Sequence, residues 1–260
     1  MKKYLYLFVV IIVLCGFGYW LLNHVNDDLG SKQIEAKIKK VTGPTDIVKQ
    51  IELTSKKQVS EEVSAERIAK SEGISDLEKV QIREWQEERG YPQFMDDGSI
   101  ITSPYESYES EILVKLAEQQ EPKALQILGD RSLRAGDFDS ATKYYLSAAV
   151  FGYTKNLVDI GNIHAFKYKK AKNAAEEKSS AIAALSWYKL AKMRGDIQVS
   201  TAKSLAGIDM SLSENEKQTV RNRANELYDS LQKQRKKLGL DNFDNAYPKA
   251  LEKIFNKKAE

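Results

Sequence analysis

The chain has 260 residues, of which 42% are hydrophobic and 30% charged, a composition that suits a folded domain rather than a disordered chain. Its formal net charge of +3 is too small to indicate a nucleic-acid partner. The single cysteine, Cys15, excludes a disulfide within the chain. With two histidines, His24 and His164, the sequence holds no Cys/His cluster at zinc-ligand spacing.

Residues 4–22 form an uncharged, strongly apolar run that begins just after Lys2 and Lys3. As a helix this run would extend about 28 Å, close to the roughly 30 Å hydrocarbon core of a bilayer. The positive-inside rule then places residues 1–3 in the cytoplasm. We therefore expect a single transmembrane helix over residues 4–22 that anchors the rest of the chain to a membrane.

The same run could instead be a cleaved signal peptide, which would leave a secreted protein. Gly16 and Gly18 make the one candidate for a cleavage site, but the apolar run continues past them to Leu22. A lipoprotein is a poorer interpretation, because Leu14 is too bulky for the position before a lipidated Cys15. The uncleaved anchor is our prediction, and the cleaved form is its alternative.

Residues 23–74 are rich in Lys, Glu, Gln and Ser and keep no helical or strand period for long. This composition predicts a flexible, charged linker. A flexible chain of this length has a root-mean-square reach of about 40 Å, so it would hold the rest of the chain near the membrane without fixing its position. A short amphipathic helix at residues 31–41 is the alternative.

Ser75 and Glu78 have the spacing of a capping box, in which the two residues satisfy each other's free backbone N–H groups at the start of a helix. The helix that they begin should end at Gly90. A turn-rich stretch follows, and then a second helix is expected at about residues 109–120.

Two stretches 43 residues apart share the pattern A-x2-[YW]-Y-x2-A-x3-G. On a helix, small and aromatic residues would alternate along one face, which lets a neighbouring helix approach closely. We expect Asp139 or Ser140 to cap the first of these helices and Gly152 to end it in the left-handed conformation. The first copy is Ala141, Tyr144, Tyr145, Ala148 and Gly152, and the second is Ala184, Trp187, Tyr188, Ala191 and Gly195.

Each copy is preceded by another expected helix, at residues 122–134 and at about residues 154–167. Gly129 and Gly161 lie 32 residues apart inside these helices. Because a glycine in a helix costs roughly 1 kcal/mol relative to alanine, their equivalent placement predicts a close helix crossing. The two spacings differ by 11 residues, which fall within residues 167–180 and either lengthen both helices or form a solvated loop.

These patterns resemble the Sel1-like repeat, a relative of the tetratricopeptide repeat. The resemblance covers residues 121–196 as two units, with a degenerate third at residues 197–212. It implies an all-α fold, a short α-solenoid of antiparallel helix pairs. Two units are too few to bury a stable core, so capping helices should close both ends.

The C-terminal part supplies one of these caps. Ser213 and Glu216 form a second capping box, and Gly239 should end the long helix that they begin. We expect the folded domain to span residues 75–255, with a basic tail at residues 256–260. The helix has an apolar stripe of Val220, Ala224, Leu227 and Leu231, and the apolar residues behind it, Leu240, Phe243, Tyr247, Pro248, Leu251, Ile254 and Phe255, should fold back onto the array.

The resemblance also implies a function, which is to hold a protein or peptide partner in a concave groove lined by the first helix of each unit. Plain solvent exposure of the same positions is the alternative. The sequence contains no nucleophile, phosphate-binding or dinucleotide motif, so we expect no enzyme activity and no cofactor. The residues expected to face the groove are Lys123, Gln126, Asp130, Arg134, Lys155 and Asn162.

Together these features predict a membrane-tethered scaffold or adaptor of the cell envelope. The family impression favours a bacterial inner membrane, with the C-terminal domain in the periplasm and no nucleic-acid partner. An accessory module that binds a cell-wall glycopeptide or a cell-wall enzyme is the alternative. The identity of the partner and the oligomeric state are left open by the sequence.

Overall fold

The computed structural model describes residues 74–93, 101–196, 208 and 212–251. All of them belong to the second of two compact units, Pro44–Glu260. The expected anchor and tail, the expected linker apart from Ile74, and most of the degenerate third unit lie outside the described residues. Ile74 is buried in a core cluster, so at this position the expected linker is already part of the folded domain. No helix within the described part is long and apolar enough to span a membrane. The expected anchor at residues 4–22 is not among these described residues.

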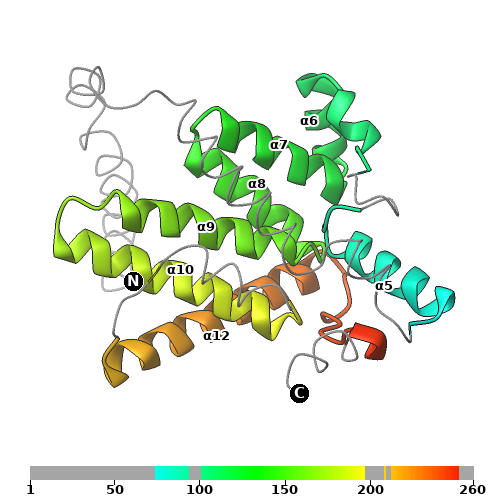
Figure 1. Ribbon diagram of the computed structural model, residues 1–260. Coiled ribbons are helices and arrows are strands. Elements are labelled where there is room, and N and C mark those ends of the chain that lie inside the picture. The colour runs from blue at the N-terminus through cyan, green and yellow to red at the C-terminus, as the bar shows by residue number, and fades with distance from the viewer. Residues whose placement is uncertain (1–73, 94–100, 197–207, 209–211, 252–260) are drawn as a thin grey trace, which may run out of the picture. The chain divides into compact units, whose positions relative to one another are not determined.

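All regular structure in the described residues is helical, which confirms the expected all-α class. The chain order is shown in Figure 1. The helices are α5 (Asp76–Glu88), the 3-10 turn η2 (Pro104–Ser107), α6 (Ser110–Glu118), α7 (Pro122–Arg134), α8 (Phe138–Val150), α9 (Lys155–Lys169), α10 (Ala174–Met193) and α12 (Glu214–Lys237), and residues 249–251 are helical again.

Four of the described α-helices, α5, α8, α10 and α12, begin at a residue whose side chain caps them, whereas α6, α7 and α9 have no side-chain cap. The capping boxes expected at Ser75 and Ser213 are both present. The expected cap of α8 is wrong, however, because the N-cap is Asp137, whose carboxylate accepts the backbone N–H of Ser140 at 2.9 Å. The helix begins earlier than expected because Phe138 packs against the main core as its first residue.

Consecutive helices pack against each other along the chain. The pairs α7–α8 and α9–α10 make the most extensive contacts, while α8 also packs on α9, α10 on α12, and α6 on α7. The turn between α9 and α10 is short, and Asn173 caps α10 by accepting the N–H of Glu176. The 11 extra residues of the second unit therefore lengthen the helices rather than form a long loop.

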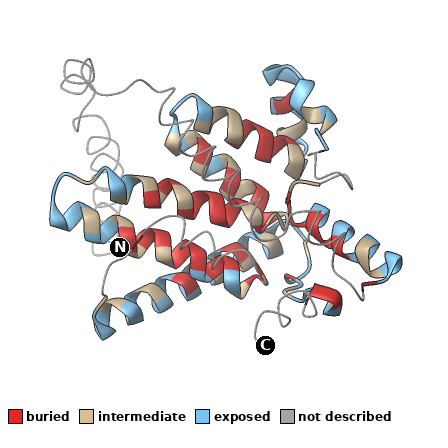
Figure 2. Ribbon diagram, in the orientation of Figure 1, coloured by how far each residue is buried: buried red, intermediate tan, exposed pale blue. Residues whose placement is uncertain are grey.

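Two glycines allow aromatic rings to enter the helix crossings. A Cβ atom added to Gly129 would lie 2.5 Å from the ring of Tyr145, and one added to Gly161 would lie 2.5 Å from the ring of Tyr188. Both rings are buried, as Figure 2 shows for the helices that carry them. The close crossings predicted from the two glycines are thus confirmed.

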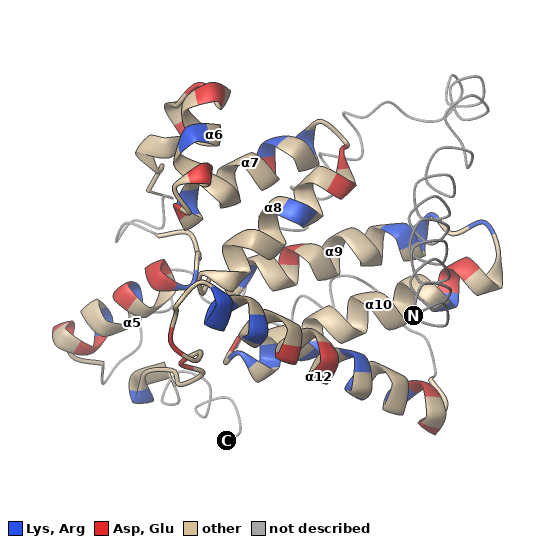
Figure 3. Cartoon of the chain, turned by 180° about the vertical axis from the view of Figure 1, so that it is seen from behind, with Lys and Arg blue, Asp and Glu red and all other residues tan. Residues whose placement is uncertain are grey.

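The core has separate clusters. The largest joins α8, α9, α10 and α12, and it includes Ala224 and Leu231 of the predicted apolar stripe as well as Phe243 beyond it. The outer surface of α12 carries charges of both signs (Figure 3), as expected of a helix with one narrow apolar stripe.

A second cluster joins the two ends of the described chain. Ile82 and Trp85 of α5 pack against Leu251, while Phe243 packs in the main core with α8, α9 and α10, as expected of the C-terminal residues. Tyr247 does not follow this prediction and is 41% exposed, while residues 254–255 lie outside the described part. The first described helix and the last described residues therefore share one apolar cluster.

Candidate partner-binding site

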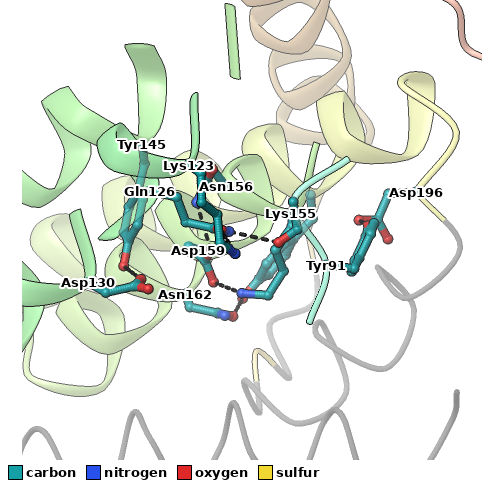
Figure 4. A network of polar contacts seen from close by, with 12 residues as sticks. Tyr91, Lys123, Gln126, Asp130, Tyr145, Lys155, Asn156, Asp159, Asn162 and Asp196 are labelled. Carbon is teal, nitrogen blue, oxygen red and sulfur yellow. Dashed lines mark hydrogen bonds and ion pairs between the residues drawn. The ribbon is translucent and has the colours of Figure 1, made fainter. Parts of the chain in front are cut away.

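The six residues expected to line a groove lie on α7 and on the first half of α9. Five of them are shown in Figure 4. Arg134 is exposed, whereas Gln126 is only 6% exposed and the other four are half-buried. Gln126 is thus covered and four positions of this polar network are partly covered, whereas the exposure of Arg134 matches the alternative of plain solvent exposure.

Two of the residues accept hydrogen bonds from the tyrosines of the repeated pattern. The hydroxyl of Tyr145 donates to Asp130 Oδ1 at 2.6 Å, and the hydroxyl of Tyr188 donates to Asn162 Oδ1 at 2.7 Å. In both units the acceptor directly follows the glycine that admits the ring. The geometry is thus repeated, with a carboxylate in the first unit and an amide in the second.

Asp159 is the central acid of the network, and the sequence analysis did not include it among the site residues. Its carboxylate pairs with Lys155 Nζ at 2.5 Å and accepts Asn156 Nδ2 at 3.2 Å. Asn156 is fully buried, and its Oδ1 has no hydrogen-bond partner within the described structure. The spacing of Lys155 and Asp159, four residues apart on a helix, is the signal that could have revealed the pair.

The charges of the network shift one another's ionisation. The pKa of Asp130 is raised to about 6, first by burial and then by the nearby Asp159 carboxylate, against the opposing hydrogen bond from Tyr145. Burial lowers the pKa of Lys123, with Asp130 opposing this shift. Burial acts to lower the pKa of Lys155, but the carboxylates of Asp159, Asp130 and Asp196 together make the net shift upward.

A segment of the chain itself already occupies one end of this network. The carbonyl of Gly90 accepts Gln126 Nε2 at 2.7 Å, and the carbonyl of Arg89 accepts the backbone N–H of Lys155 at 3.1 Å. Gly90 has a φ of +78°, and a Cβ there would lie 2.6 Å from the ring of Tyr153. Gln126 is therefore engaged by the protein's own backbone and is not free for a partner.

Tyr91 extends the network beyond this segment. It is buried, and its hydroxyl donates to the carboxylate of Asp196, on the far side of Lys155 in Figure 4. Burial raises the pKa of Tyr91 well above its ordinary value, and Asp196 adds to the shift. The first residues after α5 are thus tied both to α9 and to the end of α10.

Two further kinds of group bear on the chemistry of this site, namely metal-ligating side chains and His164. Among the described residues no group of three His, Cys, Asp or Glu side chains could hold a metal ion. His164 is half-buried on α9, where burial and the cations Lys167 and Arg223 lower its pKa to about 4, so it is neutral near pH 7.

No family model, no curated protein and no solved structure matches this chain.

Proposed function

We propose that this chain is a membrane-tethered helical-repeat protein that holds a protein or peptide partner on the polar face of α7 and α9. We call this face the α7–α9 face and define it by Lys123, Asp130, Lys155, Asp159 and Asn162. The supporting observation is the repeated contact between a tyrosine and the residue after a glycine, because it sets α7 and α9 in equivalent environments.

In this proposal α7–α8 and α9–α10 are two units of a short solenoid similar to the Sel1-like repeat. Helices α5, α6 and α12 close its ends. Beside the α7–α9 face, the side-chain amide of Gln126 and the N-terminus of α9 at Lys155 already hold the backbone carbonyls of residues 90 and 89. These are the groups by which an extended peptide is held without regard to its side chains.

The remainder of the proposal rests on sequence. Residues 4–22 anchor the chain in a bacterial inner membrane, the linker gives the domain reach, and the domain works in the periplasm as a scaffold or adaptor. The protein acts by binding and not by catalysis. Because binding surfaces of repeat arrays are set by side chains on a stacked scaffold, the partner is selected by the charges of the α7–α9 face.

The test compares two exposed arginines on different helices. A photo-crosslinking residue is placed at Arg134 on α7 or at Arg221 on α12 in the full chain, and the products trapped in native membranes are identified by mass spectrometry. We expect a partner trapped from the first position and not from the second. Reversing the charge with Lys123→Glu should then lower its capture at least about tenfold, by the usual cost of a lost interface charge.

The same products from both positions would contradict the proposal. Retention of the chain on isolated cell-wall sacculi, lost with Lys123→Glu but with no protein trapped, would instead assign the face to a glycopeptide.

A further inference from the structure

Residues 240–246, which we call the strap, follow α12 and contain no helix or strand. In Figure 1 they are part of the orange-to-red stretch that leads from α12 to the last helical residues beside α5. A segment without regular structure must satisfy its backbone groups by other means.

The strap is held mainly through its backbone carbonyls, and the donors are side chains of three separate helices or their ends. Such contacts do not depend on the side chains of the segment that is held. Arg89 Nη2 donates to Asp244 O at 2.8 Å and to Ala246 O at 2.9 Å, Trp85 Nε1 to Ala246 O at 3.0 Å, Arg194 Nη1 to Asp244 O at 3.2 Å, and Arg235 Nε to Asp241 O at 2.8 Å.

One aromatic side chain anchors the strap. The guanidinium carbons of Arg194 and Arg235 lie 3.5 Å and 4.3 Å from the centre of the Phe243 ring. Cations over an aromatic ring are attracted to its electron-rich face. Phe243 therefore contacts two guanidinium groups while its ring is buried as part of the main core.

The strap also needs a residue without a side chain beneath it. A Cβ atom on Gly195 would overlap the carbonyl oxygen of Asn245. Gly195 is the last residue of the second repeat pattern, whereas its counterpart Gly152 has no such close neighbour. The surface at the end of α10 is therefore shaped to accept a peptide backbone.

Two buried arginines of this surface are attracted electrostatically by Asp244 of the strap. Arg89 and Arg194 are 6% and 2% exposed, yet their hydrogen bonds go to neutral oxygens of carbonyl, hydroxyl and amide groups. Arg194 Nε is buried with no hydrogen-bond partner within the described structure. Since carboxylates are stronger acceptors for guanidinium than carbonyls are, an acidic ligand would match this surface better.

We propose that Trp85, Arg89, Arg194, Gly195 and Arg235 form a second peptide-binding site, which the strap fills in this structure and which a linear peptide from a partner protein fills in its place. The ligand is an acidic segment with one phenylalanine, as in the strap's own run Asp-Asn-Phe-Asp-Asn. The site uses none of the residues of the α7–α9 face, so the two binding activities are separable.

The strap competes with such a ligand from within the same chain. A tethered segment acts at an effective concentration in the millimolar range. A peptide in solution should therefore bind weakly to the natural chain and much more tightly once the strap is weakened. The strap thereby sets the affinity that a partner needs to occupy the site.

The experiment uses a fluorescent peptide with the sequence of residues 240–247 and the full chain in detergent. Binding is measured by anisotropy to the natural chain and to the Phe243→Ala variant. We expect the variant to bind at least about tenfold more tightly, because the competing strap has lost its anchor. A peptide in which the phenylalanine is replaced by alanine should bind neither chain.

A variant with unchanged helical circular dichroism that binds the peptide no better than the natural chain would overturn the proposal. A second measurement does not depend on the folding of that variant. The same peptide with benzoylphenylalanine at its aromatic position is irradiated with the natural chain at about 1 mM, the concentration needed to compete with a tether. Crosslinks should map to the end of α10 and to α12, and their absence there would equally overturn the proposal.

Discussion

The hydroxyl of Tyr145 donates to the carboxylate of Asp130 at 2.6 Å in a contact that recurs, with an amide acceptor, between Tyr188 and Asn162. The chain therefore contains a neutral version of its own charged pair. Since the amide makes the same hydrogen bond at nearly the same length, the bond does not require the negative charge of Asp130. The negative charge of Asp130 instead acts on the pKa of nearby groups such as Lys123.

The first prediction concerns Asp130→Asn and pH. The pKa of Asp130 is about 6 in the folded chain against an ordinary 3.8, so the native state binds this proton more tightly than the unfolded state. Stability should consequently fall as pH rises from about 4 to above 6, by about 1–3 kcal/mol. The asparagine variant should lack this component and be the more stable protein at pH 7.5.

Urea unfolding of both proteins at pH 5 and pH 7.5 checks this. The groups around Asp130, namely Asp159, Lys155, Arg134 and Tyr145, are common to both proteins. His164 has the opposite effect, because its lowered pKa makes stability fall with acidity between about 6.5 and 4, and it also cancels in the comparison. Identical pH dependence in the two proteins would contradict the assignment.

The second prediction isolates the tyrosine hydroxyl. Tyr145→Phe removes the donor to Asp130 and leaves the ring in place, so the free energy of unfolding should fall by about 1–2 kcal/mol. The neighbouring Tyr144 is only half-buried, and Tyr144→Phe should change stability by less than about 0.5 kcal/mol. Chemical unfolding of the two variants is the measurement, and equal losses would argue against a role for the hydrogen bond.

The third prediction concerns the glycine at each crossing. Gly129→Ala gains helix propensity of about 1 kcal/mol, but the new methyl group would collide with the ring of Tyr145. We expect a net loss of about 1–3 kcal/mol from overpacking, and a similar loss for Gly161→Ala. Ser132→Ala on the same helix is the control and should be nearly neutral. A stabilised glycine variant would show that the crossing can open without cost.

The fourth prediction compares two glycines with nearly the same backbone conformation. Gly195 and Gly136 have φ of +78° and +79°, but a Cβ on Gly195 meets Asn245 while one on Gly136 meets nothing within 4 Å. Replacing either with alanine costs about 1 kcal/mol for the left-handed backbone. Only Gly195→Ala should also release the strap.

Limited proteolysis of the full chain detects that release as faster cleavage within residues 241–246. The Gly136→Ala protein should be cleaved there at the natural rate. Equal cleavage rates in the two variants would mean that the strap does not depend on its close approach to Gly195.

The elements that were predicted correctly are those governed by residues close together in the chain. Ser75 and Ser213 cap their helices through partners three residues away, and Gly152 and Gly195 end theirs with positive φ. The error at the start of α8 arises because local residues alone did not decide that cap. Asp137, Asp139 and Ser140 are all good capping residues, and the choice among them was made by Phe138, whose packing partner Phe166 lies on α9.

The candidate site was predicted only in part. Helical spacing placed Asp130 and Asn162 on one face, but it could not show that Tyr145 and Tyr188 would reach them. It also missed Asp159, whose spacing from Lys155 is visible in the sequence but whose burial is decided by the neighbouring helices. Gln126 was expected to face a partner in the groove, whereas its side-chain amide donates to the backbone carbonyl of Gly90.

By itself the sequence determined the helices, their caps and the repeated aromatic and glycine positions, because propensity, capping and helical periodicity act within a few residues. The tertiary structure decided which polar groups meet and that the two ends of the described chain pack together. Trp85 donates to the carbonyl of Ala246 across 161 positions of sequence, and Arg89 holds the same carbonyl. Such contacts exist only after the intervening helices have stacked, because stacking alone fixes the distance between residues so far apart.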